Sequence, residues 1–198
     1  MMKLLLIDEK RMFLDAIGQL LALENKFSSI EQHTTIEGAF DYLKVNRADV
    51  IVTDYLIHEE TSSITVFKQR WPETKIIILS EHLRSGYIKK ALEEGCDGYI
   101  SKSAKVIELV SAIDDVLKGH IAIEPRLAVT ALRDKDPLTD TEKKLLRLVG
   151  RDKSNREIAE IVCLGEGTVR NYMSVAMSKL FVSSRGAAYR KAHASGWL

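Results

Sequence analysis

The first 118 residues alternate short apolar runs with amphipathic stretches, and this alternation is the feature that most constrains the fold. Each run is short, and several contain β-branched residues, which is typical of strands buried on both faces. The runs are Lys3–Ile7, Phe27–His33, Asp49–Thr53, Lys75–Leu79 and Gly98–Ile100. The stretches between them repeat apolar side chains every three or four residues, which predicts helices. Five strands alternating with five helices predict an α/β doubly wound fold, a five-stranded parallel sheet covered on both faces.

A different pattern begins at Gly119, which we expect to end the last of these helices. The segment His120–Pro125 predicts an extended stretch, and Pro125 is a good first residue for a short helix. Charged residues and a proline follow at 133–137. We therefore predict one domain over residues 1–118 and a linker with a short helix over residues 119–137.

Residues 138–198 show helical patterns only, and we predict a small all-α domain there. Two capping boxes mark helix starts, one at Thr139 with Glu142 and one at Ser154 with Glu157. A third helix is predicted from about Gly167 to Leu180, and a fourth follows it. A short turn joins the second and third helices, and this arrangement is typical of a helix-turn-helix.

The net charge of the chain is +1, but the charge is unevenly distributed. Residues 1–118 carry 15 basic and 19 acidic side chains, whereas residues 137–198 carry 11 and 6. A small basic helical domain fits DNA binding, because Lys and Arg neutralise phosphates. Charge alone fits a solvated surface equally well, and the helix-turn-helix pattern favours the DNA interpretation.

Other features of the sequence exclude several classes of protein. The purely apolar runs are too short for a membrane span or a signal peptide. Cys96 and Cys163 lie far apart with no Cys/His cluster beside them, which argues against disulfides and a zinc site. We therefore expect a protein of the reducing cytoplasm with no membrane insertion.

Polar side chains stand at the ends of four predicted strands. In an open parallel sheet, the carboxyl ends of the strands meet at one edge, where ligands bind. Three carboxylates converging there need a cation such as Mg²⁺, and one of them can then attack a phosphoryl group to form an acyl phosphate. A lysine and a hydroxyl would bind the phosphoryl oxygens. These residues are Asp8, Glu9, Asp54, Ser80 and Lys102.

Their order and spacing make residues 1–118 resemble a two-component receiver domain. The resemblance implies that Asp54 is the phosphoacceptor and that Asp8, Glu9, Asp54 and the Leu56 carbonyl bind Mg²⁺. It implies that Ser80 is the switch hydroxyl, Tyr99 the switch aromatic and Lys102 the phosphate-binding lysine. After phosphorylation we expect Ser80 to move toward the phosphoryl group and Tyr99 to swing inward. The loop after Asp54 lacks the usual Met-Pro and a following Gly, so we expect a longer or looser loop and an altered phosphoryl lifetime.

Residues 138–194 resemble the LuxR-type helix-turn-helix of the NarL/FixJ regulators, and the run Gly167-Thr-Val-Arg-Asn-Tyr172 with the Gly-Trp ending resembles the DesR-like members. The resemblance implies two sets of DNA contacts on or near the third helix. Base contacts are expected from Arg170, Asn171 and Ser174. Phosphate contacts are expected from Ser154, Thr168, Tyr172 and Lys179. Phe181 replaces a usual glycine, and we interpret it as core packing, with an apolar interface as the alternative.

Together the two resemblances imply a DNA-binding transcriptional regulator that is phosphorylated by a sensor histidine kinase and forms a homodimer on activation. The dimer surface is either the first and fifth helices, with Met12, Ile113 and Leu117 at their edges, or the face of the fourth helix, fifth strand and fifth helix. We expect no enzymatic turnover, because an aspartyl phosphatase would carry a second Asp where Leu56 stands. A flavodoxin-like electron carrier is disfavoured, because no Ser/Thr/Gly-rich phosphate loop follows the first strand. The alternative of a receiver that works independently of phosphorylation stays open.

Overall fold

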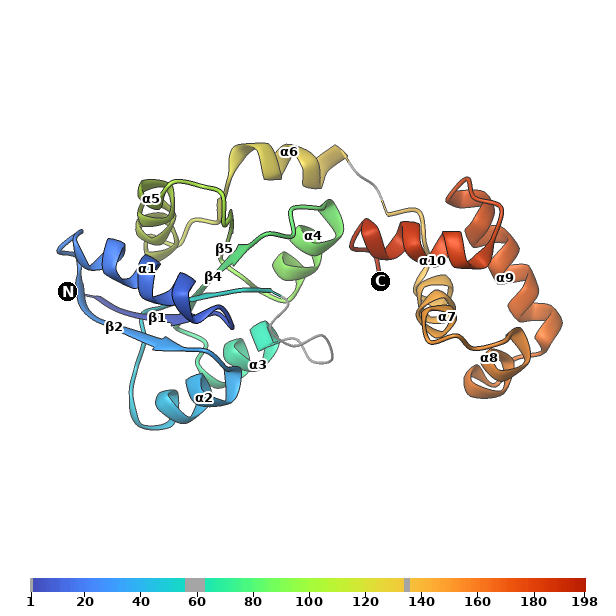
Figure 1. The fold of residues 1–198 in the computed structure, drawn as a ribbon, viewed down its shortest axis with the longest axis horizontal. Coiled ribbons are helices and arrows are strands. Elements are labelled where there is room, and N and C mark those ends of the chain that lie inside the picture. The colour runs from blue at the N-terminus through green and yellow to red at the C-terminus, as the bar shows by residue number, and fades with distance from the viewer. Residues whose placement is uncertain (1, 56–62, 134–135) are drawn as a thin grey trace. The chain divides into compact units, whose positions relative to one another are not determined.

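The computed structural model describes residues 2–55, 63–133 and 136–198. They divide into two compact units between Val129 and Thr130. The first unit is a sheet with helices on both sides, and the second is built from helices (Figure 1). In the described part of the chain, no helix is both long and apolar enough to cross a membrane.

All strands of the first unit are parallel and form one sheet, in the order β2-β1-β3-β4-β5-β6. This arrangement confirms the predicted doubly wound α/β fold. A sixth short strand, from the predicted linker, extends the sheet because the Ala122 N–H donates to the Asp97 carbonyl at 2.9 Å. The strands are β1 (Met2–Ile7), β2 (Phe27–His33), β3 (Val50–Thr53), β4 (Lys75–Ser80), β5 (Gly98–Ser101) and β6 (Ala122–Ile123).

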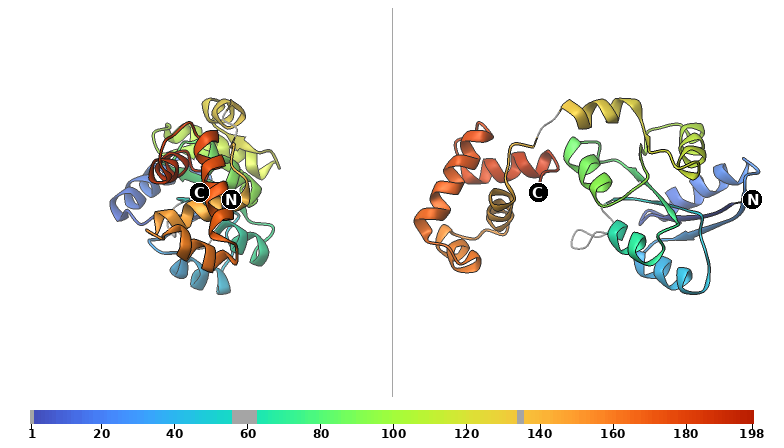
Figure 2. Two further views of the ribbon diagram at one scale, coloured as in Figure 1. Left: turned by 90° about the vertical axis from the view of Figure 1, so that its right-hand side faces the viewer. Right: turned by 180° about the vertical axis from the view of Figure 1, so that it is seen from behind.

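Helices cover both faces of this sheet, with α1 and α5 on one side and α2 and α3 on the other (Figures 1 and 2). Alternate residues of β1 explain the two layers. Leu4 and Leu6 belong to the core beneath α1 and α5, and Leu5 between them is fully buried toward the other side. The helices are α1 (Arg11–Ala22), α2 (Ile36–Val45), α3 (Ser63–Arg70), α4 (Ser85–Glu93) and α5 (Val106–Leu117).

One residue expected at the edge of α5 lies elsewhere. Ile113 is only 1% exposed and packs in the core with Leu14 and Ile17 of α1, so its placement on an exposed edge was wrong. The helical repeat turns Ile113 toward the sheet, where it removes apolar surface from water. Met12 and Leu117, the other two residues expected there, are exposed.

Short helices make up the second unit and the segment before it. Both predicted capping boxes are present, since the Thr139 hydroxyl accepts from the Glu142 N–H and the Ser154 hydroxyl from the Glu157 N–H. The core is apolar and includes Leu146. The helices are α6 (Pro125–Arg133), α7 (Asp140–Gly150), α8 (Asn155–Val162), α9 (Glu166–Lys179) and α10 (Arg185–Ala194).

The turn after α9 corrects the interpretation of Phe181. Its side chain is 90% exposed and its φ is 53°, so the prediction that it packs in the core was wrong. Leu180, which ends α9, occupies the core position instead and is 1% exposed. The left-handed backbone at Phe181 follows the end of α9, and the Phe181 side chain projects into solvent, while the next residue, Val182, packs against the core.

Candidate functional site

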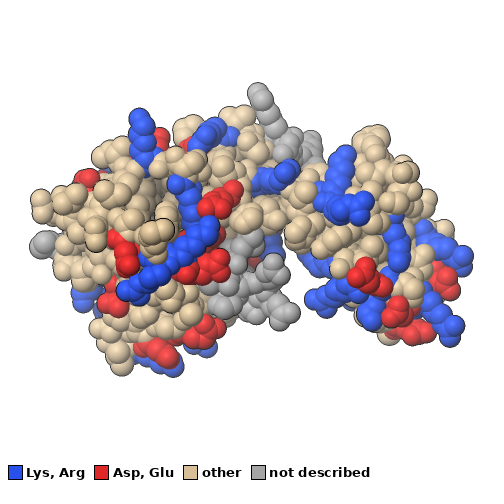
Figure 3. Space-filling view, in the orientation of Figure 1, with Lys and Arg blue, Asp and Glu red and all other residues tan. Residues whose placement is uncertain are grey.

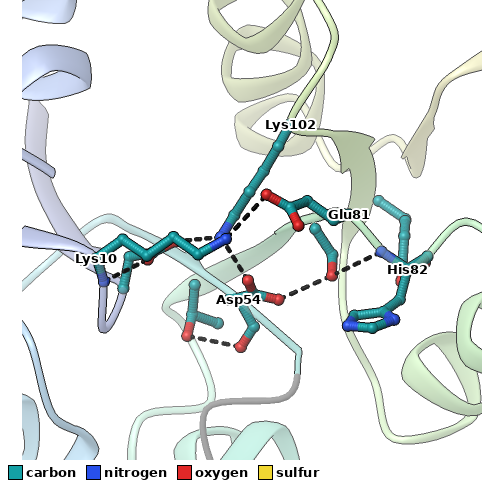
Figure 4. Close-up of polar contacts among 9 residues, drawn as sticks. Lys10, Asp54, Glu81, His82 and Lys102 are labelled. Atoms are coloured by element: carbon teal, nitrogen blue, oxygen red, sulfur yellow. Dashed lines mark hydrogen bonds and ion pairs between the residues drawn. The ribbon is translucent and has the colours of Figure 1, made fainter. Parts of the chain in front are cut away.

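The carboxyl edge of the sheet brings two predicted carboxylates and the predicted lysine together. Asp8 follows β1, Asp54 follows β3 and Lys102 follows β5. The Lys102 Nζ lies 2.5 Å from Asp8 Oδ2 and 2.5 Å from Asp54 Oδ2 (Figure 4). The three parallel strands end at the same edge, and this is why residues 46 or more positions apart meet there.

Burial makes the charges of this cluster interdependent. The side chains of Lys102 and Asp8 are 6% and 4% exposed, whereas that of Asp54 is 17% exposed. Burial disfavours ionisation of Asp54, but hydrogen bonds from Lys102 and Ser80 outweigh it and lower its pKa. Burial likewise opposes the charge on Lys102, yet its bonds to Asp54 and Asp8 raise its pKa. Asp54 therefore stays a carboxylate and is the more open of the two acids.

Ser80 and Tyr99 both lie in buried, inward positions. The Ser80 hydroxyl is fully buried and donates to Asp54 Oδ1 at 2.8 Å. Tyr99 is also fully buried, and its hydroxyl donates to the His82 carbonyl at 2.5 Å. Burial raises the pKa of Tyr99, so the phenol stays neutral. Both side chains therefore face inward, with the Ser80 hydroxyl in contact with Asp54.

The other predicted metal ligands contribute less to the described site. Glu9 is exposed at the start of the β1–α1 loop, whereas Leu56 and the rest of residues 56–62, where we predicted a longer or looser loop, lie outside the described residues. Across the described residues, no three acidic, His or Cys side chains are grouped to hold a metal. Even so, carboxylate oxygens of Asp8 and Asp54 both contact the Lys102 ammonium group. Two hard carboxylates completed by water fit the way proteins bind Mg²⁺, so the donor chemistry fits this ion.

Two residues of the site were missed by sequence reasoning. Lys10 Nζ lies 2.9 Å from Glu81 Oε1, and this pair joins the β1–α1 loop to the end of β4 (Figure 4). The hydrogen bond and charge of Lys10 lower the pKa of Glu81. Isolated surface charges are common in sequences, so the only signal was that Lys10 lies two residues after Asp8 and that Glu81 directly follows Ser80.

The helical unit presents the predicted base-contacting residues on one side of α9. Arg170, Asn171 and Ser174 are exposed, whereas Val169 and Met173 are buried on the opposite side. Figure 3 shows Lys and Arg side chains on the visible face of this unit, interspersed with acidic ones. An exposed polar stripe on the second helix of a helix-turn-helix is suited to a major groove.

The residues predicted to contact phosphates differ more in their surroundings. Thr168 and Ser154 are exposed, and Tyr172 is half-buried. Lys179 lies 2.8 and 2.9 Å from the two carboxylate oxygens of Glu142, which is only 3% exposed. Sequence reasoning missed this ion pair between α7 and α9, because nothing in the spacing of residues 37 apart indicates contact.

A receiver-like α/β unit with an acid–lysine cluster, followed by a helix-turn-helix unit, defines the class of response regulators. Comparison with known families supports each half. Residues 4–114 match the response regulator receiver domain, and residues 136–192 match the bacterial regulatory proteins of the luxR family. The chain belongs to the response regulators with a LuxR-type DNA-binding domain, the NarL/FixJ family.

Relatives match along the full chain. The transcriptional regulatory protein DesR of Bacillus subtilis (strain 168) is 34% identical over 197 residues, covering 100% of this chain and 99% of DesR. The regulatory protein YvfU of the same organism is 32% identical, with 100% of both chains covered. The structure of RcsB from Salmonella enterica serovar Typhimurium bound to promoter rprA has a TM-score of 0.71 at 20% identity, with 100% of both chains covered. The last likeness shows a shared fold.

These findings establish the general function. The protein is a two-component response regulator, a phosphorylation-dependent transcriptional regulator that binds DNA through its LuxR-type domain.

Proposed function

We propose that Asp54 accepts the phosphoryl group from a sensor histidine kinase. An Asp54 oxygen would form a bond to phosphorus while the bond from phosphorus to the kinase histidine nitrogen breaks. The observation that carries this assignment is the exposure of Asp54, at 17% of its side chain, beside a more buried Asp8. Ser80 and Lys102 hold one Asp54 oxygen each, which fixes the direction from which a donor can approach.

The surrounding residues would then bind the transferred group. Lys102 would ion-pair with one phosphoryl oxygen, and the Ser80 hydroxyl would donate to another. Asp8 and Asp54, with Glu9 and the Leu56 carbonyl implied by the family resemblance, would hold Mg²⁺. When bound, the ion supplies positive charge that offsets the phosphoryl oxygens. We propose no turnover of external substrates, so the site is regulatory rather than enzymatic.

Phosphorylation would act by stabilising the inward arrangement of Ser80 and Tyr99 over its alternatives, and so shift a two-state receiver toward dimerisation. We propose that the dimer forms through α1 and α5. Exposed large apolar side chains in the described receiver occur on these helices and not on α4, and partial burial of such side chains would stabilise a dimer. They include Met12, Leu20, Ile107 and Leu117.

The helical domain would read promoter DNA in the cytoplasm, where such DNA lies. We propose base contacts from Arg170, Asn171 and Ser174, which α9 leaves exposed. Phosphate contacts would come from Ser154, Thr168, Tyr172 and Lys179. We propose residues 1–118 as the receiver, 119–137 as the linker with its short helix, and 138–198 as the DNA-binding domain.

Beryllofluoride with Mg²⁺ tests this function in the full chain. The wild-type protein should become dimeric by light scattering and bind promoter DNA more tightly, and Asp54→Ala should do neither. Asp41→Ala, which removes an exposed acid from α2, should behave as the wild type. If Asp54→Ala responds as the wild type does, Asp54 is not the phosphoacceptor.

A further inference from the structure

An ion pair links the two loops that flank Asp54. Lys10, at the start of α1, and Glu81, directly after β4, lie 2.9 Å apart between Nζ and Oε1. Figure 4 shows the two side chains reaching toward each other above the sheet edge that carries Asp54. Their side chains are 50% and 64% exposed, so the pair lies at the solvent boundary of the site.

Each partner is anchored to the acid–lysine cluster by its neighbours. The Lys10 backbone N–H donates to Asp8 Oδ1 at 2.8 Å, while Glu81 follows Ser80, whose hydroxyl donates to Asp54. The charges of Lys102 and Asp54 both act on the Glu81 carboxyl, which places it within electrostatic reach of the reacting carboxylate. The pair therefore completes a ring. Contacts run from Asp8 through Lys10 to Glu81, the chain leads from Glu81 to Ser80, and Ser80 contacts Asp54. Lys102, which contacts both Asp54 and Asp8, closes the ring.

We propose that the Lys10–Glu81 pair controls exchange of the Asp54 phosphoryl group with small molecules, both phosphodonors and water. This inference rests on the proposed phosphorylation of Asp54. The pair would act in two ways. It blocks part of the path to Asp54 from solvent, and it sets the charge that an incoming anion meets.

Small molecules reach Asp54 from solvent in two reactions, uptake of a phosphoryl group from a donor and hydrolysis by water. With a small acyl phosphate, an Asp54 oxygen bonds to phosphorus while the bond from phosphorus to the acyl oxygen breaks, and a free carboxylate leaves. In hydrolysis, a water oxygen bonds to phosphorus while the bond to Asp54 breaks, the water loses a proton to solvent, and inorganic phosphate leaves. Donor uptake is sensitive to charge because the donor is an anion, whereas water is neutral. The pair should therefore affect the two reactions differently.

Removing single partners separates obstruction from charge. Glu81→Ala takes away both the obstruction and a negative charge, so donor uptake and hydrolysis should each rise. Lys10→Ala leaves Glu81 uncompensated, so hydrolysis should rise while uptake of a dianionic donor falls. Coupling energies of exposed ion pairs predict changes of about two- to five-fold. Because the partners touch, the effects of the double variant should not be the sum of the single ones.

The experiment measures phosphorylation and dephosphorylation rates of the full chain with Mg²⁺, using acetyl phosphate and the less highly charged phosphoramidate. The informative quantity is the uptake rate from acetyl phosphate divided by the uptake rate from phosphoramidate. A merely structural change would leave this ratio constant. Lys10→Ala should lower the ratio in favour of phosphoramidate, and Glu81→Ala should raise it. Added salt should shrink both changes.

Lys44→Ala is the matched control, because it removes an ion pair of similar exposure, to Asp41, from the last turn of α2. It should alter neither the ratio nor hydrolysis. If the wild type takes up no phosphoryl group from either donor, the proposed function itself fails. If it is phosphorylated but the Lys10 and Glu81 variants match the control in both the ratio and hydrolysis, the inference about the pair is wrong.

Discussion

At the scale of single residues, Phe181 has the conformation least suited to its side chain. A left-handed backbone costs a residue with a Cβ about 1–2 kcal/mol, and the exposed ring gains no burial in return. Glycine adopts this conformation freely but loses about 0.5–1 kcal/mol more conformational entropy on folding. The first effect is the larger of the two, so a substitution by glycine should stabilise the domain.

We predict that Phe181→Gly raises the free energy of unfolding by roughly 0.5–1 kcal/mol, the difference between these two effects. Urea titration of the full chain, followed by the far-ultraviolet circular dichroism signal, measures the change. Phe181→Ala keeps the Cβ and should gain little. Equal stability of the Gly and Ala variants would contradict the backbone explanation and point instead to the loss of the exposed ring.

The residues of the receiver site differ in how well sequence could predict them. Asp8, Asp54 and Lys102 follow buried strands, and strand ends can be read from apolar runs, so their meeting at one edge was predictable. Lys10 and Glu81 belong to the same edge but were not predicted. Their contact depends on the rotamers of two long side chains, which no local pattern encodes.

At the scale of elements, the contact between α7 and α9 depends on an ion pair as well as on apolar packing. Glu142 caps α7 through the Thr139 N–H at 2.8 Å and also binds Lys179 of α9. Burial opposes ionisation of Glu142, but the bonds from Lys179 and Thr139 outweigh it and lower its pKa. Loss of Lys179 would leave a buried carboxylate with an unpaired charge.

We predict that Lys179→Met lowers the free energy of unfolding at neutral pH by about 1–3 kcal/mol, a typical cost for a buried polar group that loses its partner. Thermal or urea unfolding provides the measurement. Lys144→Met, an exposed position on α7, is the control and should change stability little. Since Lys179 is also a proposed phosphate contact, unchanged stability with weaker DNA binding would contradict the structural role.

The same pair should make stability depend on pH. The folded-state pKa of Glu142 is lowered below its usual 4.5, so its stabilising contribution is present above that value and disappears as the pH falls through the folded pKa. The difference between the wild type and Lys179→Met should therefore shrink in acid. A difference that stays constant down to strongly acidic pH would show that Glu142 ionisation is not involved.

At the scale of the whole molecule, the acidic receiver is the proposed site of phosphorylation, and the basic domain binds DNA. If phosphorylation acts through dimerisation, the second DNA contact becomes intramolecular and binding tightens without new protein–DNA contacts. If it acts by freeing the DNA-binding domain, every DNA contact benefits equally. The number of half-sites in the DNA therefore distinguishes these two mechanisms.

We predict that beryllofluoride increases affinity at least about ten-fold for DNA with two half-sites spaced by about one helical turn, ~10 base pairs, and changes affinity for a single half-site little. Fluorescence anisotropy with both DNAs at matched salt concentration measures the effect. Asp54→Ala should show no gain on either DNA. An equal gain on one and two half-sites would favour release of the DNA-binding domain over dimerisation.

The sequence by itself determined the order of elements, the edge at which Asp8, Asp54 and Lys102 meet, and the starts of α7 and α8. Apolar periodicity and capping chemistry are local, so they can be read along the chain. Tertiary structure alone decided the pairing of β6 with β5, the burial of Ile113 and the inward position of the Ser80 and Tyr99 side chains. It also decided which charges pair across elements, because these outcomes depend on which distant surfaces come together and exclude water.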